Sequence, residues 1–213
     1  MIWLDLALGR TDSPDLERED HARLFEPQRW AELERSLPSV RRESVAGRLL
    51  LAHLLRERCP DLPLPPRLDY GRVGKPRLRD VPLHFNLSHS EGWAVCALCP
   101  AEVGVDLQRN REIRPGIVRR FAPAERAALE QLPEEARNAA LCRLWSLKEA
   151  WCKCTGEGLT VPLDRAVFTL DPLSIDRPEF TVRTPEPPEP GWSLAVCVRA
   201  RDPLTLRVRV VDL

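Results

Sequence analysis

The sequence shows no excess of charge of either sign, because 32 Lys and Arg residues balance 32 Asp and Glu residues. General nucleic-acid-binding proteins carry a basic surplus, so this balance argues against that class, although a local basic patch for a small phosphorylated ligand remains compatible with it. The first residues, MIWLDLALGRTD, lack the basic and apolar regions of a secretory signal, and no apolar run is long enough to span a bilayer. We therefore expect a cytoplasmic protein that binds neither nucleic acid nor membrane.

The cysteines do not form a convincing metal-binding pattern. Seven are present, an odd number, and reduced thiols are the default in a cytosolic protein. Cys96 and Cys99 would point to opposite faces of a strand. Cys152 and Cys154 are two residues apart on a predicted helix and would not face each other. Buried, inert cysteines are therefore favoured over a structural zinc site.

Hydrophobic periodicity and turn residues predict blocks of strands and helices that follow the same order twice. Strands are expected at residues 2–8, 68–70, 83–90, 93–99, 102–108, 166–170, 180–184, 192–198 and 204–211, and helices at 27–37, 41–59, 123–132 and 134–155. Strand, helices and strands occur once up to about residue 100 and again after it. This order predicts an α+β fold with two similar α+β halves, residues 1–100 and residues 101–213.

Four polar motifs interrupt the apolar pattern. They are Gly74-Lys75-Pro76, Asn86-Leu87-Ser88-His89-Ser90, Gly104-Val105-Asp106-Leu107-Gln108, and the helical segment from Lys148 through Glu149 to Lys153. In the second motif, strand alternation places Asn86, Ser88 and Ser90 on one face and His89 on the other. Hydroxyl and imidazole groups can donate hydrogen bonds to phosphate oxygens. The alternative for this motif is a capped strand end followed by an exposed turn.

The third and fourth motifs each contain a carboxylate in an unusual setting. Asp106 shares a strand face with Gly104 and Gln108, which leaves space beside it, and such an aspartate either satisfies backbone donors or binds Mg²⁺. Glu149 and Lys153 are four residues apart and are neighbours on one helix face. An exposed salt bridge is the alternative there, but the neighbouring tryptophans Trp145 and Trp151 argue against full exposure on every side.

Taken together, the motifs predict one site for a pyrophosphate-bearing substrate on Mg²⁺. Asp106 and Glu149 supply carboxylates for the cation, and four cationic side chains are available for phosphates: Lys75, His89, Lys148 and Lys153. Neither GxxxxGK[ST] nor a GxGxxG motif that opens a helix is present, which disfavours the ordinary nucleotide-binding folds.

This set of motifs, in this order, resembles the 4′-phosphopantetheinyl transferase superfamily, in its long, surfactin-type monomeric branch. The resemblance rests on GKP at 74–76, FNLSHS at 85–90, GVDLQ at 104–108, RRFAPAE at 119–125 and WSLKEAWCKCTGEGL at 145–159. It spans roughly residues 40–165, and the set is specific although no single motif is.

The resemblance implies a pseudo-two-fold fold with coenzyme A bound in the cleft between the halves. It implies that a serine hydroxyl of an apo acyl or peptidyl carrier protein attacks the β-phosphorus, takes the phosphopantetheine arm and releases adenosine 3′,5′-bisphosphate. Asp106 and Glu149 are then magnesium ligands, with Glu149 also the base for the serine. The implied coenzyme contacts are Gly74, Lys75, Pro76, Asn86, Ser88, His89, Lys148 and Lys153.

Two features depart from the family pattern. Many relatives have a second acid where this chain has Gln108, so we expect the Gln108 carbonyl or a water molecule to complete the metal shell. The helix arginine near the 3′-phosphate is also ambiguous among Arg29, Arg35, Arg41 and Arg42, of which Arg42 and Arg35 are the preferred candidates. Two alternatives stay open: a catalytically degenerate module that docks carrier proteins, and a Mg²⁺-dependent hydrolase of nucleotide pyrophosphates. Two halves in one chain favour a monomer.

Overall fold

The computed structural model describes residues 1–71, 74–158 and 161–213, and it confirms a mixed α+β fold. One sheet has the strand order β11-β1-β5-β4, from Leu204–Val210, Ile2–Arg10, Trp93–Cys99 and His84–Ser90. The second has the order β6-β10-β9, from Val103–Arg109, Trp192–Val198 and Thr181–Arg183. Two small hairpins are β2–β3, Leu68–Tyr70 with Pro76–Leu78, and β7–β8, Phe168–Leu170 with Leu173–Ile175.

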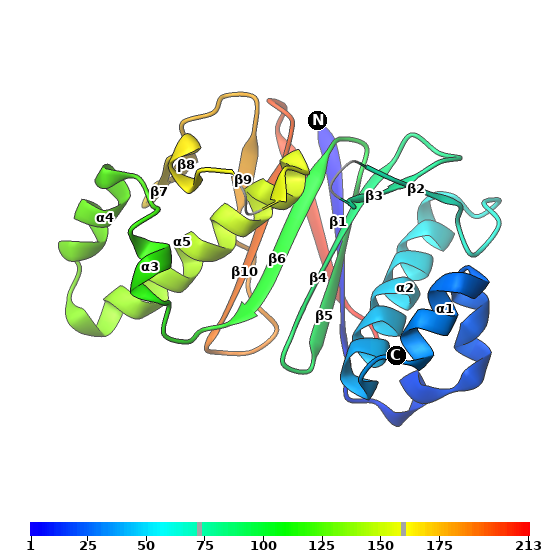
Figure 1. The fold of residues 1–213 in the computed structure, drawn as a ribbon. Coiled ribbons are helices and arrows are strands. Elements are labelled where there is room, and N and C mark those ends of the chain that lie inside the picture. The colour runs from blue at the N-terminus through cyan, green and yellow to red at the C-terminus, as the bar shows by residue number, and fades with distance from the viewer. Residues whose placement is uncertain (72–73, 159–160) are drawn as a thin grey trace.

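The two sheets pack face to face between two groups of helices, as Figure 1 shows. The long helix α2, Pro38–Arg58, covers the first sheet beside α1, Pro27–Glu34, and α5, Glu134–Thr155, covers the second. The short helices α3, Pro115–Val118, and α4, Pro123–Glu130, lie on the α5 side. Every residue of β5 and β10 is buried, which explains why β5 is a continuous apolar run and β10 is apolar except at Ser193.

The ends of the two long helices follow simple rules of helix termination. α2 has Pro38 in its first turn, where a missing N–H costs nothing. α5 begins with Glu134 and Glu135, whose negative charges suit a helix N-terminus. It ends at Gly156, which has φ 73° in the left-handed region that glycine adopts without steric cost. Leu159, the last residue of the motif at 145–159, lies outside the described residues.

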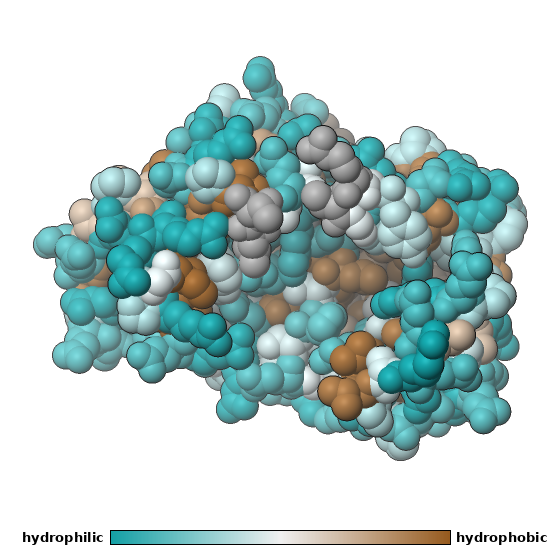
Figure 2. Space-filling view, in the orientation of Figure 1, coloured by the Kyte–Doolittle hydropathy of each residue, from teal (hydrophilic) through white to brown (hydrophobic). Residues whose placement is uncertain are grey.

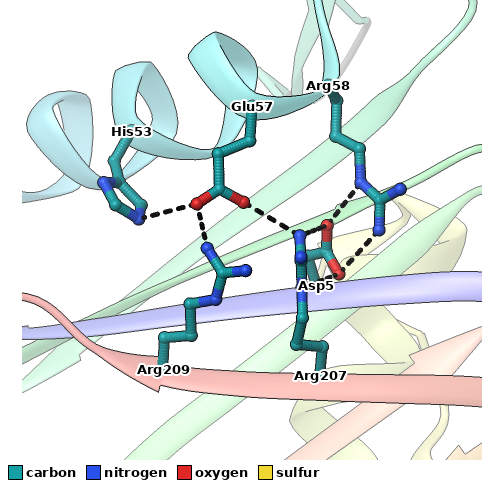
Figure 3. Close-up of polar contacts among 6 residues, drawn as sticks. All are labelled: Asp5, His53, Glu57, Arg58, Arg207 and Arg209. Atoms are coloured by element: carbon teal, nitrogen blue, oxygen red, sulfur yellow. Dashed lines mark hydrogen bonds and ion pairs between the residues drawn. The ribbon is translucent and has the colours of Figure 1, made fainter.

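The C-terminal strand returns to the N-terminal part of the chain, where β11 pairs with β1 in parallel. The buried Asp5 of β1 accepts hydrogen bonds from Arg58 of α2 and Arg207 of β11 (Figure 3). Burial alone would raise the pKa of Asp5, but the two guanidinium groups outweigh it and hold that pKa below its usual value. Glu57 pairs with Arg207 and Arg209, so an ionic network joins α2, β1 and β11.

The division into halves at residue 100 stays a prediction, and β11 lies in the sheet formed by β1, β4 and β5. Within the part of the chain that the structure describes, no helix combines the length and apolarity that crossing a membrane requires. Figure 2 shows that the face seen in Figure 1 is mostly hydrophilic and is hollowed near its centre, where hydrophobic atoms are visible.

Candidate active site

A cavity of about 670 Å³ opens where β4 and β6 lie beside α5. Its lining combines residues from three of the four predicted motifs: Ser88, His89, Asp106, Gln108, Glu149 and Lys153. Strand alternation directs Gly104, Asp106 and Gln108 of β6 toward the same side, and α5 occupies that side. The sequence predicted free space beside Asp106 on this face of β6. In the structure α5, the helix that supplies Glu149 and Lys153, occupies that face.

Asp106 is buried, at 4% exposure, and its two carboxylate oxygens have different surroundings. Oδ1 accepts a hydrogen bond of 2.7 Å from the Lys153 ammonium and one of 3.2 Å from the Ser88 hydroxyl. Oδ2 is buried and has no hydrogen-bond partner among the described residues. A buried carboxylate oxygen without a donor is costly unless a ligand satisfies it, so Oδ2 is an acceptor that a bound cation would use.

Glu149 is half-buried beside Asp106, one helical turn before Lys153. Burial, followed by the negative charge of Asp106, raises the pKa of Glu149 to about 7, and the Lys153 ammonium opposes this shift. Two carboxylates this close repel each other when both are ionised. A divalent cation between them removes that repulsion.

The donor set fits Mg²⁺, which in proteins takes one or two carboxylates and completes its octahedron with water and substrate phosphates. Asp106 and Glu149 provide the carboxylates, and no group of three or more His, Cys, Asp or Glu side chains with metal-site geometry occurs among the described residues. The Gln108 side chain is held by its amide nitrogen, which donates to Ser146 Oγ at 2.8 Å and to the Cys142 carbonyl. Its carbonyl oxygen is the only metal ligand this side chain offers.

Comparison with known proteins assigns the chain to a family. A profile of the 4′-phosphopantetheinyl transferase superfamily matches residues 102–197, which include the two carboxylates. The 4′-phosphopantetheinyl transferase psf-1 of Bacillus pumilus is 37% identical over 188 residues, covering 82% of this chain and 78% of that protein. HetI of Nostoc sp., also named a 4′-phosphopantetheinyl transferase, is 31% identical over 192 residues, covering 86% and 77%. Sfp of Bacillus subtilis, with the same enzyme name, is 33% identical over 145 residues, covering 64% of each protein.

This chain belongs to the 4′-phosphopantetheinyl transferase family. The resemblance based on the five sequence motifs is thereby confirmed, and with it the expectation that the chain is a transferase. The comparisons do not assign roles to the individual site residues.

Lys148 does not line the cavity, contrary to its expected role as a phosphate contact. Its side chain is fully buried, and its ammonium forms a 2.7 Å ion pair with Glu125 of α4. It also donates hydrogen bonds to the carbonyls of Leu163 and Ala166. Burial lowers the pKa of Lys148, and the charge of Glu125 opposes that shift. The lysine thus ties α5 to α4 and to the segment after α5, while the adjacent Glu149 faces the cavity.

We expect Lys148→Met to lower the free energy of unfolding by about 3 kcal/mol, because Glu125 stays buried without its cation. The measurement is urea denaturation of both proteins. The matched control is the double variant Glu125→Gln/Lys148→Met, which leaves no unpaired buried charge at this position and should therefore recover part of the lost stability. A Lys148→Met protein that is as stable as wild type but no longer binds coenzyme A would instead place Lys148 at the substrate.

The motif Gly74-Lys75-Pro76 lies outside this cavity. The Lys75 ammonium donates to the backbone carbonyls of Val103 and Cys154, so it joins the start of β6 to the last turn of α5. Burial lowers the pKa of Lys75. Gly74, directly before Lys75, has φ 83°. Pro76 lines a second cavity of about 570 Å³ beside α1 and α2.

The arginines preferred from the sequence do not line either cavity. Arg42 pairs with Glu17, and Arg35 donates to the carbonyl of Ala31 within its own helix. The second cavity is lined instead by Arg29 and Arg48, together with Phe25, Tyr70, Phe85 and Leu87. Arg48 lies 5.5 Å from the Phe25 ring. Arg48 lies on the inner face of α2 beside buried residues. This position in the helical pattern could have made Arg48 the first candidate for a phosphate contact.

One wall of the first cavity is formed by the segment that follows β6, and the sequence did not predict this wall. Arg111, Ile113 and Arg114 line the cavity from this segment, and Ile117 of α3 adds to it. No periodic pattern marks the segment, since α3 has only four residues. Arg111 and Arg114 bring positive charge to this wall and Glu112 brings negative charge, and the charge of Arg111 acts on Glu149.

In protein free of divalent cations, wild type should lose stability relative to Glu149→Gln as the pH rises from about 4.5 to about 7. The pKa of Glu149 is about 7 in the fold against an ordinary 4.5, so the folded state holds a proton that the unfolded chain has released. The stability that Glu149 contributes to the wild type is therefore greatest below about pH 4.5, the pKa of Glu149 in the unfolded chain. It falls as the pH rises through about 7, the pKa of Glu149 in the folded protein. Urea denaturation of both proteins across this pH range measures the difference. If their free energies of unfolding changed with pH in the same way, the raised pKa of Glu149 would be contradicted.

Proposed function

We propose that the chain transfers the 4′-phosphopantetheine arm of coenzyme A to a serine of an apo acyl or peptidyl carrier protein. The serine oxygen forms a bond to the β-phosphorus of coenzyme A. The bond between that phosphorus and the bridging oxygen breaks, and adenosine 3′,5′-bisphosphate leaves with the electron pair. The serine proton passes to the carboxylate of Glu149.

One observation carries this proposal: in a member of this family, Asp106, Glu149 and Lys153 line the same cavity. Phosphoryl transfer asks the protein mainly to position the reactants and to stabilise charge. Lys153, which is ion-paired to Asp106 at this cavity, would offer its ammonium to a pyrophosphate oxygen. His89 lines the same cavity and is ion-paired with Glu43 at 3.1 Å, and it would donate to a phosphate when protonated.

Asp106 and Glu149 would hold Mg²⁺, with Gln108 able to add its carbonyl oxygen or a water molecule. When bound, the cation supplies charge stabilisation to the pyrophosphate as the bridging bond weakens. The protein's own contribution would be to offer Oδ2 of Asp106, which has no hydrogen-bond partner among the described residues, and to hold Glu149 in the lining of the cavity that the serine would enter.

The nucleotide portion of coenzyme A would lie in the second cavity. Leu87 lines both cavities, so the two are adjacent, and one extended ligand could occupy both. Arg29 and Arg48 would meet the 3′-phosphate there, in place of Arg35 and Arg42. The coenzyme would then span the proposed halves 1–100 and 101–213. Because one chain supplies both cavities, the enzyme would act as a monomer, and the balanced charge and reduced cysteines of the sequence favour the cytoplasm.

The test is the intact mass of candidate apo carrier proteins after incubation with this protein, coenzyme A and Mg²⁺. We expect an increase by one phosphopantetheine group, lost when a chelator is added or when the acceptor serine is replaced by alanine. No increase with fatty-acid, polyketide or peptide carriers would overturn the proposal. Release of free phosphopantetheine without any carrier would identify a hydrolase instead.

A further inference from the structure

The strands β4 and β6 belong to different sheets, yet side chains of β4 bind the backbone of β6. Asn86 Oδ1 accepts from the Val105 N–H at 2.9 Å, Ser88 Oγ accepts from the Leu107 N–H at 3.2 Å, and Ser90 Oγ accepts from the Arg109 N–H at 3.4 Å. Each pair is separated by 19 residues, so the two strands run in step and in the same direction. We call these three side-chain-to-backbone hydrogen bonds the seam.

The seam supplies hydrogen-bond acceptors to backbone N–H groups of β6 that no neighbouring strand among the described residues pairs with. β6 is the edge strand of its sheet and pairs with β10 on one side only. The backbone N–H groups of Val105 and Leu107 on its other side would be buried without acceptors, at a cost of about 1–3 kcal/mol each, whereas the N–H of Arg109 lies at the exposed end of the strand. Short polar side chains at every second position of β4 point to one face and supply those acceptors. The alternation of Asn86, Ser88 and Ser90 therefore has a structural use that phosphate binding does not explain.

Ser88 differs from the other two seam residues because its hydroxyl also contacts the catalytic groups. Besides accepting from Leu107, Oγ accepts from the Lys153 ammonium at 2.8 Å and donates to Asp106 Oδ1 at 3.2 Å. A hydroxyl offers one donor and two acceptor positions, so all three are used within the protein. Ser88 is 6% exposed, and the described structure gives Asn86 and Ser90 no hydrogen bond to Asp106 or Lys153.

We propose that Ser88 is a positioning residue: its single hydroxyl sets the spacing between the two sheets and orients Asp106 and Lys153 at the same time. With Oδ1 of Asp106 held by Ser88 and Lys153, Oδ2 is left as the oxygen directed to a ligand. The oxygen atom of Ser88 thus connects the sheet that contains β4 to the carboxylate of Asp106, and a shift of that sheet would move this carboxylate. The inference rests on the proposed function, and it gives Ser88 a role distinct from direct contact with coenzyme A.

The experiment compares Ser88→Ala with Ser90→Ala and Ser88→Thr. Ser90→Ala is the matched control for the Mg²⁺ dependence: Ser90 lines the same cavity, but its hydroxyl has no hydrogen bond to Asp106 or Lys153 in the described structure, so the variant loses one seam hydrogen bond and no contact with those two residues. For Ser88→Ala we expect the Mg²⁺ concentration at half-maximal transfer to rise about tenfold or more, as seen when groups that orient metal ligands are lost. We expect the KM for coenzyme A to change less than about threefold. Ser88→Thr, which keeps the hydroxyl, should restore the Mg²⁺ dependence.

A second readout needs neither metal nor turnover. In metal-free protein, amide hydrogen exchange measured by NMR should quicken at Leu107 in Ser88→Ala and at Arg109 in Ser90→Ala, with Val105 unchanged in both. Unchanged exchange at Leu107 would refute the seam. Faster exchange with the same Mg²⁺ dependence as Ser90→Ala would refute the positioning role alone. If wild type transfers nothing, the proposed function fails, and the exchange data still decide whether Ser88 joins the strands.

Discussion

Glu149→Gln should lower the rate of phosphopantetheine transfer about a thousandfold, a loss within the range measured for general acid–base groups. Glutamine keeps the size of the side chain but can neither accept the serine proton nor offer a charged oxygen to Mg²⁺. The fold should survive, because Glu149 is half-buried at a cavity and glutamine removes a carboxylate whose burial is unfavourable. Initial rates of carrier modification, followed by intact mass, give the measurement.

Glu135→Gln is the matched control for this substitution. Glu135 lies in the first turn of the same helix, where it is exposed and far from the cavity lining. Its replacement should leave transfer at the wild-type rate. If Glu149→Gln retained more than about a tenth of wild-type turnover, another group would have to take the serine proton.

Elements with strong local patterns were predictable to the residue. The predicted strand 93–99 and helix 134–155 coincide with β5 and α5. β5 is apolar throughout because it is buried on both faces, and the glycine after Thr155 ends α5 in the left-handed conformation. Among the shortest elements, β2 was expected at its observed residues 68–70, whereas β3, β8 and α3 were missed, because three or four residues carry too little periodicity to be recognised consistently.

The position of Lys148 shows where the sequence argument failed. Adjacent residues on a helix are separated by about 100°, so Lys148 and Glu149 do not share a face. The residues four positions away from Lys148 are Leu144 and Cys152, both buried, and this pattern already indicates the core face. Its partner Glu125, however, lies on another helix, and no sequence spacing predicts a pair brought together by packing.

Gly104 illustrates a correct observation with an unexpected cause. The sequence indicated that Gly104, Asp106 and Gln108 leave room on one face of a strand, and a ligand was the expected occupant. The structure places α5 there, and the missing side chain at Gly104 lets the helix approach β6. The glycine therefore serves the site indirectly, since the closeness of α5 to β6 brings Glu149 and Lys153 to Asp106.

Gly104→Ala should accordingly destabilise the protein by about 4 kcal/mol or more, beyond ordinary overpacking. A Cβ atom there would lie 2.0 Å from the carbonyl oxygen of Ala150 and 2.4 Å from the amide nitrogen of Cys154. Both are backbone atoms of α5, so no change of rotamer relieves the overlap, and the helix itself must move. Transfer should fall with stability, because the helix carries Glu149 and Lys153. Urea denaturation and carrier modification measure the two effects.

Gly116→Ala separates this steric effect from the general loss of a glycine. The nearest atom to a Cβ at Gly116 is 3.7 Å away, at the tip of the Arg119 side chain, which is ordinary contact. We expect it to change the free energy of unfolding by less than about 1 kcal/mol, since alanine also reduces the freedom of the unfolded chain. If Gly104→Ala were as stable and active as Gly116→Ala, α5 would lie farther from β6 than the structure places it. Asp106 and Glu149 would then be too far apart to share one cation.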